Sequence, residues 1–168
     1  MPVDFFIAKC QTENVRDEEF GICDDDDTTL KTPAYVDTAQ PDKWVAVVRN
    51  KSVKPINFTA VDNCVEIRRS DGTMDFRCDA MLTNADHIVF VELKDQVSDW
   101  ISHAVDEQLQ TTIDHFKTHH DLSKYKYKRA FACNKKHPNF RVSYKDKMTA
   151  FYRKNGIRLS LEREIVFK

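Results

Sequence analysis

Residues 65–94 decide the fold, and they read VEIRRSDGTMDFRCDAMLTNADHIVFVELK. β-Branched and aromatic residues alternate here with polar ones, and Asp71-Gly72 is a dipeptide typical of hairpin turns. The pattern predicts a meander of three strands: one over 64–69, one that ends in residues 78–82, and one over 87–94. Three charged residues interrupt this otherwise apolar pattern.

These three residues are Asp79, Glu92 and Lys94. Side chains two positions apart on a strand share a face, so Glu92 and Lys94 point the same way and Leu93 points the opposite way. If the second and third strands pair antiparallel, Asp79 lies across from them. Two carboxylates favour Mg²⁺ or Mn²⁺, and a nearby lysine can orient a water or neutralise a phosphate. The alternative is a cross-strand ion pair of Lys94, worth less than about 1 kcal/mol when exposed.

This arrangement resembles the PD-(D/E)XK nuclease superfamily, which includes many restriction endonucleases, archaeal Holliday-junction resolvases and RecB-like nucleases. Glu92-Leu93-Lys94 is the only Asp/Glu-x-Lys triplet in the chain and closes an apolar strand before a long amphipathic helix. The resemblance covers residues 64–135. It implies that Asp79 and Glu92 bind the metal, that the Leu93 carbonyl is a further ligand and that Lys94 is the catalytic lysine. Cys78 stands where the motif has its most variable residue, proline.

Two further residues are candidates for the site. In RecB-like relatives a glutamine of the helix that follows reaches the active site, and Gln108 resembles it, although the usual tyrosine four residues later is Thr112 here. A glutamine at the edge of the apolar stripe is the alternative. The Asp71-Gly72 turn pairs Glu66 with Arg77 and places Glu66 diagonally from Asp79, which makes Glu66 either an accessory acid or an ion-pair partner of Arg77.

The rest of the chain predicts an α/β fold with a mixed central sheet flanked by helices. Apolar residues at helical spacing predict a helix over 98–119, with Ser98 as its N-cap, and residues 127–133 read as a fourth strand parallel to the third. A capping box at 143–146 opens a second helix that ends at Asn155-Gly156, and 157–161 is a fifth strand. This order matches a restriction-endonuclease-like core. Two apolar runs over 44–61 predict an additional hairpin, or a helix over 40–50.

Charge is distributed unevenly along the 168 residues, which fit a single domain. The net charge is −8 over residues 1–42, −4 over 43–123 and +11 over 124–168, although the whole chain has −1. A basic C-terminal segment is typical of a protein that binds the nucleic-acid backbone, and a solvated charged face is the alternative. The acidic segment 1–42 contains four consecutive aspartates, Asp24 to Asp27, which predict an exposed loop.

Cysteine and histidine contribute no clear site. The five cysteines are scattered without a C-x-x-C pair, which argues against structural zinc and against a disulfide framework, and Cys64, Cys78 and Cys133 are expected to be small buried residues. His115 and His119 have chelating spacing but no evident third ligand, so we interpret them as structural. An early acid of the family's site would be one of Glu13, Asp17, Glu18 and Glu19.

The sequence thus predicts a hydrolase, namely a Mg²⁺- or Mn²⁺-dependent DNA endonuclease, with RNA as an open alternative substrate. A second hypothesis is a catalytically silent nuclease-fold protein with a binding, regulatory or immunity role. No apolar run reaches membrane-spanning length and no signal-like N-terminus is present, so the expected location is cytoplasmic, with no membrane partner. Homodimerisation is common among such nucleases, but no interface pattern is visible.

Overall fold

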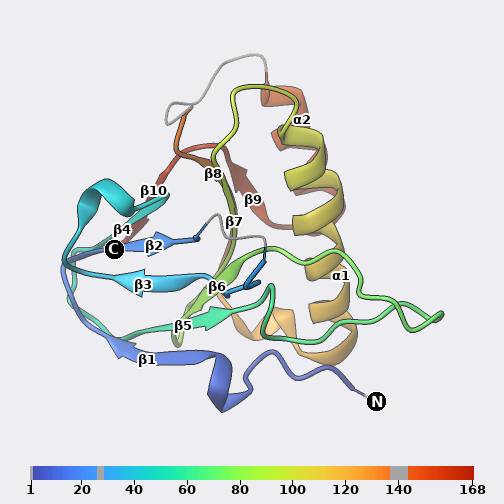
Figure 1. Cartoon of the computed structure of the whole chain (residues 1–168), viewed down its shortest axis with the longest axis horizontal. Helices are drawn as coiled ribbons and strands as arrows, with labels where there is room; N and C mark the ends of the chain where they lie inside the picture. The colour runs from blue at the N-terminus through green and yellow to red at the C-terminus, as the bar shows by residue number, and fades with distance from the viewer. Residues whose placement is uncertain (1, 26–28, 137–143) are drawn as a thin grey trace.

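The computed structural model describes residues 2–25, 29–136 and 144–168. Within them the chain forms a mixed α/β fold with two mixed sheets (Figure 1). The six-stranded sheet has the order β1 (Gln11–Val15), β5 (Ile56–Ala60), β6 (Ala80–Thr83), β7 (His87–Lys94), β8 (Tyr127–Asn134) and β9 (Arg158–Ser160). The four-stranded sheet has the order β10 (Glu164–Phe167), β4 (Ala46–Asn50), β2 (Glu19–Cys23) and β3 (Tyr35–Asp37).

The principal helix begins as the π-helix η3 (His103–Leu109) and continues as α1 (Gln110–His119). The second helix is α2 (Lys145–Asn155), and Gly156 ends it in the left-handed conformation, with φ of 68°, as the sequence predicts. Short 3₁₀ turns are η1 (Ala8–Cys10), η2 (Pro41–Lys43) and η4 (Leu122–Lys124). In the part of the chain that the structure describes, none of the helices has the length and apolar character needed to cross a membrane.

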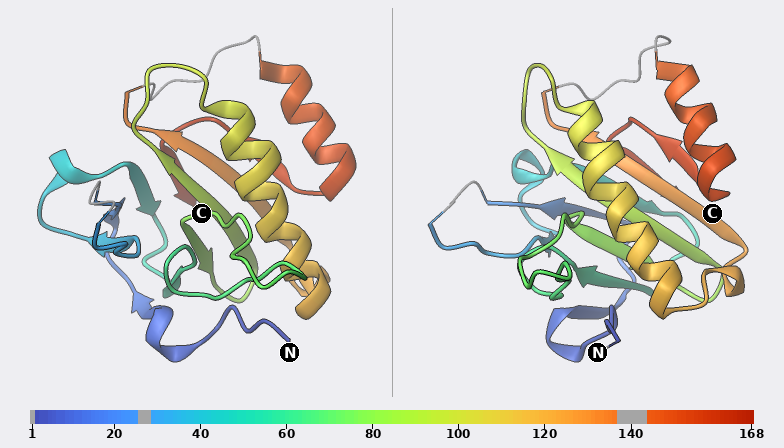
Figure 2. Two further views of the ribbon diagram at one scale, coloured as in Figure 1. Left: turned by 45° about the vertical axis from the view of Figure 1, so that its right-hand side comes forward. Right: turned by 90° about the vertical axis from the view of Figure 1, so that its right-hand side faces the viewer.

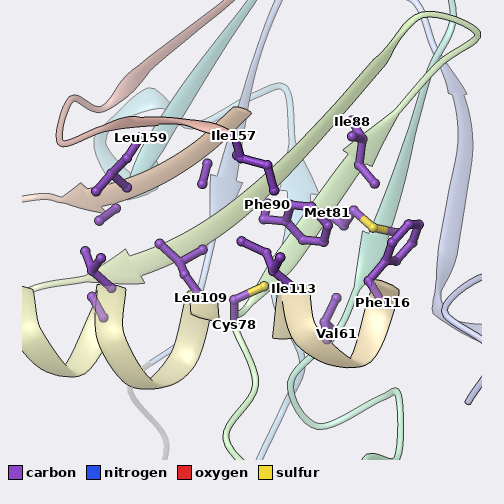
Figure 3. Packing of buried hydrophobic residues seen from close by; sticks show 14 of the residues in the cluster. Val61, Cys78, Met81, Ile88, Phe90, Leu109, Ile113, Phe116, Ile157 and Leu159 are labelled. Atoms are coloured by element: carbon purple, nitrogen blue, oxygen red, sulfur yellow. The ribbon is translucent and has the colours of Figure 1, made fainter. Parts of the chain in front are cut away.

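The molecule has three layers: the helices, the six-stranded sheet and the four-stranded sheet (Figure 2). On β7, Ile88 and Phe90 face the helices and pack with Leu109, Ile113 and Phe116 (Figure 3). The alternate residues Val89 and Val91 face the second sheet. Because both faces of β7 are covered, its sequence is a nearly continuous apolar run. The sequence predicted a central sheet flanked by helices. In the structure the helices cover only one face of this sheet, and the second sheet covers the other.

From β6 onward, the order and direction of the strands in the six-stranded sheet are those predicted from the sequence. β6 and β7 pair antiparallel, and β7, β8 and β9 are parallel, with the helical crossover between β7 and β8 as predicted. The first helical residue is Ile101, two residues before η3, and not Ser98 as predicted, because Asp99 has a left-handed φ of 57°. Ser98 is therefore not its N-cap. The second helix is confirmed from Lys145, but Ser143 of the predicted capping box lies outside the described residues.

The predicted first strand of the meander is wrong. Residues 64–69 are irregular and form a single bridge between Arg68 and Met74. A turn is present at this point, with Gly72 at φ 88°, but the Gly72 N–H donates to the Arg69 carbonyl, and the register differs by one residue from the predicted pairing of Ser70 with Thr73. The chain turns away at Asn63, where φ is 62°, and β5 takes the place beside β6. The meander is therefore β5–β6–β7, and residues 61–79 are an excursion between its first two strands.

The predicted hairpin over 44–61 is also wrong. β4 pairs with β2 and β10 in one sheet, whereas β5 pairs with β1 and β6 in the other. The acidic segment 1–42 contributes β1, β2 and β3, and β2 is buried from Phe20 to Cys23. Asp24 and Asp25 follow β2 directly, whereas Asp26 and Asp27 lie outside the described residues.

Cys10 and Cys64 form a disulfide, with Cα atoms 5.8 Å apart and a sequence separation of 54. The interpretation of Cys64 as an unpaired buried residue is therefore wrong. The pair meets because Cys10 precedes β1, Cys64 follows β5, and these two strands are neighbours. Cys78 and Cys133 are free and buried, as expected. A cytoplasmic location stays a prediction.

Gly21 on β2 lies against the ring of Trp44. A Cβ added at this glycine would be 1.9 Å from Cγ of Trp44, whose ring is buried and donates a hydrogen bond from Nε1 to Asp37. We expect Gly21→Ala to destabilise the protein by roughly 2 kcal/mol, because the indole must leave its packed position. Urea unfolding measures this effect. Gly72→Ala is the control: it meets no neighbour and should cost only about 1 kcal/mol for its left-handed backbone. Equal costs for the two substitutions would contradict the steric explanation.

Candidate metal and catalytic site

Asp79 and Glu92 lie side by side where β6 begins and β7 ends. The antiparallel register pairs Ala80 with Val91, which brings the residues flanking that pair next to each other. Oδ2 of Asp79 accepts a hydrogen bond of 2.7 Å from the backbone N–H of Leu93. Both acids are buried, with 7% of Asp79 and 1% of Glu92 exposed. The predicted approach of the two carboxyl groups is present in the structure.

Lys94 completes the group as the next residue on the same face of β7. Its Nζ lies 2.9 Å from Oε2 of Glu92 and donates a 2.6 Å hydrogen bond to Oε1 of Gln108. Leu93 points the opposite way and belongs to the core between the two sheets. The structure thus brings Asp79, Glu92, Lys94 and Gln108 together and places the Leu93 backbone beside Asp79.

Gln108 belongs to the π-helix η3, whose wider turns are rare and often occur at functional sites. Thr112, one turn further along, ties this helix to the strand that carries Asp79. Its hydroxyl donates to the Gln108 carbonyl at 2.8 Å and accepts from the backbone N–H of Cys78 at 2.7 Å. Thr112, at the position where the resemblance led us to expect a tyrosine, therefore holds the helix against the segment that carries Asp79.

Burial and mutual repulsion disfavour two negative charges at this place. Burial, followed by the nearby charge of Glu92, raises the pKa of Asp79 well above its usual value. Burial also raises the pKa of Glu92 to about 7, although Lys94 acts in the opposite direction. Burial and mutual repulsion both favour the protonated form, so this pair holds a proton more tightly than free carboxyl groups do. A cation beside them would remove the need for that proton.

The residues fit a bound divalent cation in one specific respect. Oε1 of Glu92 is buried and has no hydrogen-bond partner, which is costly for a carboxylate oxygen unless a cation or water satisfies it. Within the described ranges no group of three or more His, Cys, Asp or Glu side chains is arranged to hold a metal. The protein ligands would therefore be Asp79, Glu92 and the Leu93 carbonyl, with water at the remaining positions, as Mg²⁺ commonly has.

Glu66 is not part of the site. Its side chain is 72% exposed and lies 3.6 Å from Arg68, while Arg77 pairs with Asp62 at 3.0 Å. The predicted pairing of Glu66 with Arg77 is wrong, because the strand on which the register depended is absent. Asp62 is the acid that sequence reasoning missed: its charge contributes to raising the pKa of both Asp79 and Glu92. Asp62 lies two residues after the end of β5, and only the pairing of β5 with β6 in the structure reveals that it is close to the site.

The other candidates lie elsewhere. His115 pairs with Asp75 at 3.0 Å, and His120, which directly follows α1, accepts a hydrogen bond from the backbone N–H of Phe5. These two contacts join the helix to two loops. Glu19, on β2, pairs with Arg49, which also contacts Glu164. In the described segments no interaction links any of the four early acids, Glu13, Asp17, Glu18 and Glu19, to Asp79 or Glu92.

Comparisons of this chain with models of protein families, with curated proteins and with solved structures give no significant match.

Proposed function

We propose that this protein is a metal-dependent phosphodiesterase of the PD-(D/E)XK type that cleaves DNA. The observation that carries the proposal is the buried group of Asp79, Glu92 and Lys94, in which Oε1 of Glu92 has no partner. A protein gains no stability from two adjacent buried carboxyl groups of raised pKa. Such a costly arrangement is expected where it serves binding or catalysis.

Each side chain has a role in this proposal. Asp79 and Glu92 bind Mg²⁺ or Mn²⁺, with the Leu93 carbonyl as a further ligand. When bound, the metal supplies a positive charge that polarises the phosphate and lowers the pKa of a water. Lys94 neutralises charge that develops on the phosphate, and Gln108 fixes the position of its ammonium group through the 2.6 Å hydrogen bond.

The order of elements supports a restriction-endonuclease-like core. β5, β6 and β7 form a meander, a helix crosses to the parallel strand β8, and α2 leads to β9. The two acids and the lysine lie at the β6–β7 end where the resemblance to this family expects them. The four-stranded sheet against the other face is an addition to that core.

DNA is the proposed substrate because the basic segment continues from the core into α2. Lys147 of α2 pairs with Asp106 of η3 at 2.8 Å, which brings the exposed basic side of α2 next to the helix that carries Gln108. Lysine and arginine on such a surface bind the phosphate backbone without reading sequence. RNA offers the same phosphates and is the alternative substrate.

A second candidate is a catalytically silent nuclease fold with a binding or regulatory role. The enclosure of the site favours it: only 10% of the Lys94 side chain is exposed, and Lys94 already neutralises Glu92. In such a protein the three residues would act as a buried ion pair with a shared proton. A substrate phosphate would then have no way to reach Lys94.

Titration of Mn²⁺ into the wild type and Asp79→Asn, with plasmid cleavage on the same samples, separates the two candidates. We expect the substitution to remove a metal ligand while keeping shape, so that Mn²⁺ affinity falls at least about tenfold and cleavage is lost. The control is Asp86→Asn, an exposed acid in the turn at the other end of β7. Metal binding without cleavage would favour the silent fold, and no binding by the wild type would overturn the metal site.

A further inference from the structure

A second surface with an unusual composition lies at the opposite end of the sheet from Lys94. A hollow of about 640 Å³ opens where β7, β8 and β9 begin. Five of its ten lining residues are Lys or Arg and none is Asp or Glu. The residues that matter here, which we call the basic hollow, are Lys126, Tyr127, Lys128, Arg129, Tyr152 and Arg158.

The positive charge of the basic hollow is not balanced by the protein. In the described part of the chain no ion pair involves any of its lysines or arginines. The guanidinium of Arg129 lies over the rings of Phe131 and Phe167, and its Nη1 donates to the Val166 carbonyl at 2.9 Å, but Nε and Nη2 are buried without a hydrogen-bond partner. Several like charges gathered without counter-charges repel one another, so an anion that enters the hollow would lower the energy.

Two tyrosines lie among these charges with much of their rings open. Tyr152 on α2 is 51% exposed and Tyr127 on β8 is 46% exposed. The guanidinium of Arg158 lies 5.8 Å from the ring centre of Tyr152, and Lys126 lies 5.2 Å from that of Tyr127. Exposed aromatic rings beside cations form the usual platform for stacking bases and holding their phosphates.

We propose that the basic hollow binds a nucleoside phosphate, with the base stacked on Tyr152 and the phosphates held by Arg158 and Lys128. Its volume is that of a pocket for one small ligand. The ligand is either a free nucleotide or one unit of a nucleic-acid strand, since both present the same base and phosphate. This inference does not rest on the proposed nuclease activity: β7 has eight residues, so the hollow lies about 23 Å from Lys94.

The test measures binding of two fluorescent probes in EDTA at low salt: a single-stranded DNA of about 12 nucleotides and an ATP analogue. We expect the wild type to bind at least one probe with a Kd below about 100 µM. Arg158→Glu should weaken that binding at least about tenfold and Tyr152→Ala at least about fivefold. Tyr152→Phe should bind like the wild type, because it keeps the ring.

The matched control is Arg16→Glu, which makes the same charge change on an exposed residue next to β1, at the opposite edge of the sheet. Binding of the oligonucleotide alone identifies a strand as the ligand, and binding of the ATP analogue identifies a free nucleotide; both support the proposal. Absence of binding to both probes at about 1 mM overturns it, as does equal binding by Arg158→Glu, Tyr152→Ala and Arg16→Glu. Both probes are measured in EDTA, so this binding does not depend on the metal site, and a failed nuclease assay leaves the result intact.

Discussion

Lys94→Met is expected to reduce metal-dependent DNA cleavage by about 10²- to 10³-fold while Mn²⁺ still binds. The substitution keeps the length of the side chain and removes the ammonium group that lies 2.9 Å from Glu92 and 2.6 Å from Gln108. Because Lys94 is not a metal ligand in the proposed site, its loss should change the rate far more than the affinity for the ion. Plasmid cleavage and Mn²⁺ titration on the same preparation measure the two effects.

Lys94→Met can also reduce cleavage indirectly, through the protonation of Glu92. Lys94 lowers the pKa of Glu92, so the substitution also makes Glu92 harder to ionise. Cleavage is therefore measured from about pH 7 to 9, since a rate lost only through protonation of Glu92 would recover at high pH. Lys9→Met is the control, because it removes an exposed lysine of η1 that lies outside both the site and the basic C-terminal segment. Full recovery at high pH, or equal loss in the control, would contradict a direct role for Lys94.

Local sequence signals predicted the part of the fold that carries the site. β7 is apolar along its length, the helix after it has an amphipathic pattern, and Gly156 ends α2. From these the parallel crossover and the shared face of Glu92 and Lys94 follow by geometry alone. The position of Asp79 next to Glu92 was predicted correctly, because Asp79 directly precedes β6 and a single turn joins β6 to β7.

The errors concern contacts that no local pattern encodes. A turn forms around Asp71-Gly72, but its register differs by one residue from the predicted one and its arms separate. The predicted register therefore placed Glu66 beside the site, whereas the additional acid near Asp79 and Glu92 is Asp62. The distribution of β4 and β5 between two sheets depends on partners far along the chain, as does the disulfide between Cys10 and Cys64. Gln108 was predicted through the family resemblance, whereas the π-helix around it had no signal in the sequence.

The metal-free protein is expected to lose stability as the pH rises from about 5.5 to 8, and Glu92→Gln to reduce that loss, with Asp79, whose pKa is also raised, as its remaining source. The pKa of Glu92 is about 7 in the fold against 4.5 for the free group, so the folded state binds the proton more tightly. Stability from this group is therefore complete below about pH 4.5 and is lost as the pH rises through 7. Between pH 5.5 and pH 8 the loss from this group amounts to roughly 2 kcal/mol. Urea unfolding at both pH values in EDTA measures it.

Glu66→Gln is the matched control, because it makes the same change on an exposed glutamate and should keep the wild-type pH dependence. A wild type equally stable at both pH values, or the same decline in Glu92→Gln, would contradict the raised pKa. Mn²⁺ should offset the wild-type loss at pH 8 but give little stabilisation at pH 5.5, where the ion must displace protons from both carboxyl groups. The protons held by Asp79 and Glu92 would thus compete with the metal, and raising the pH would favour their exchange for the ion.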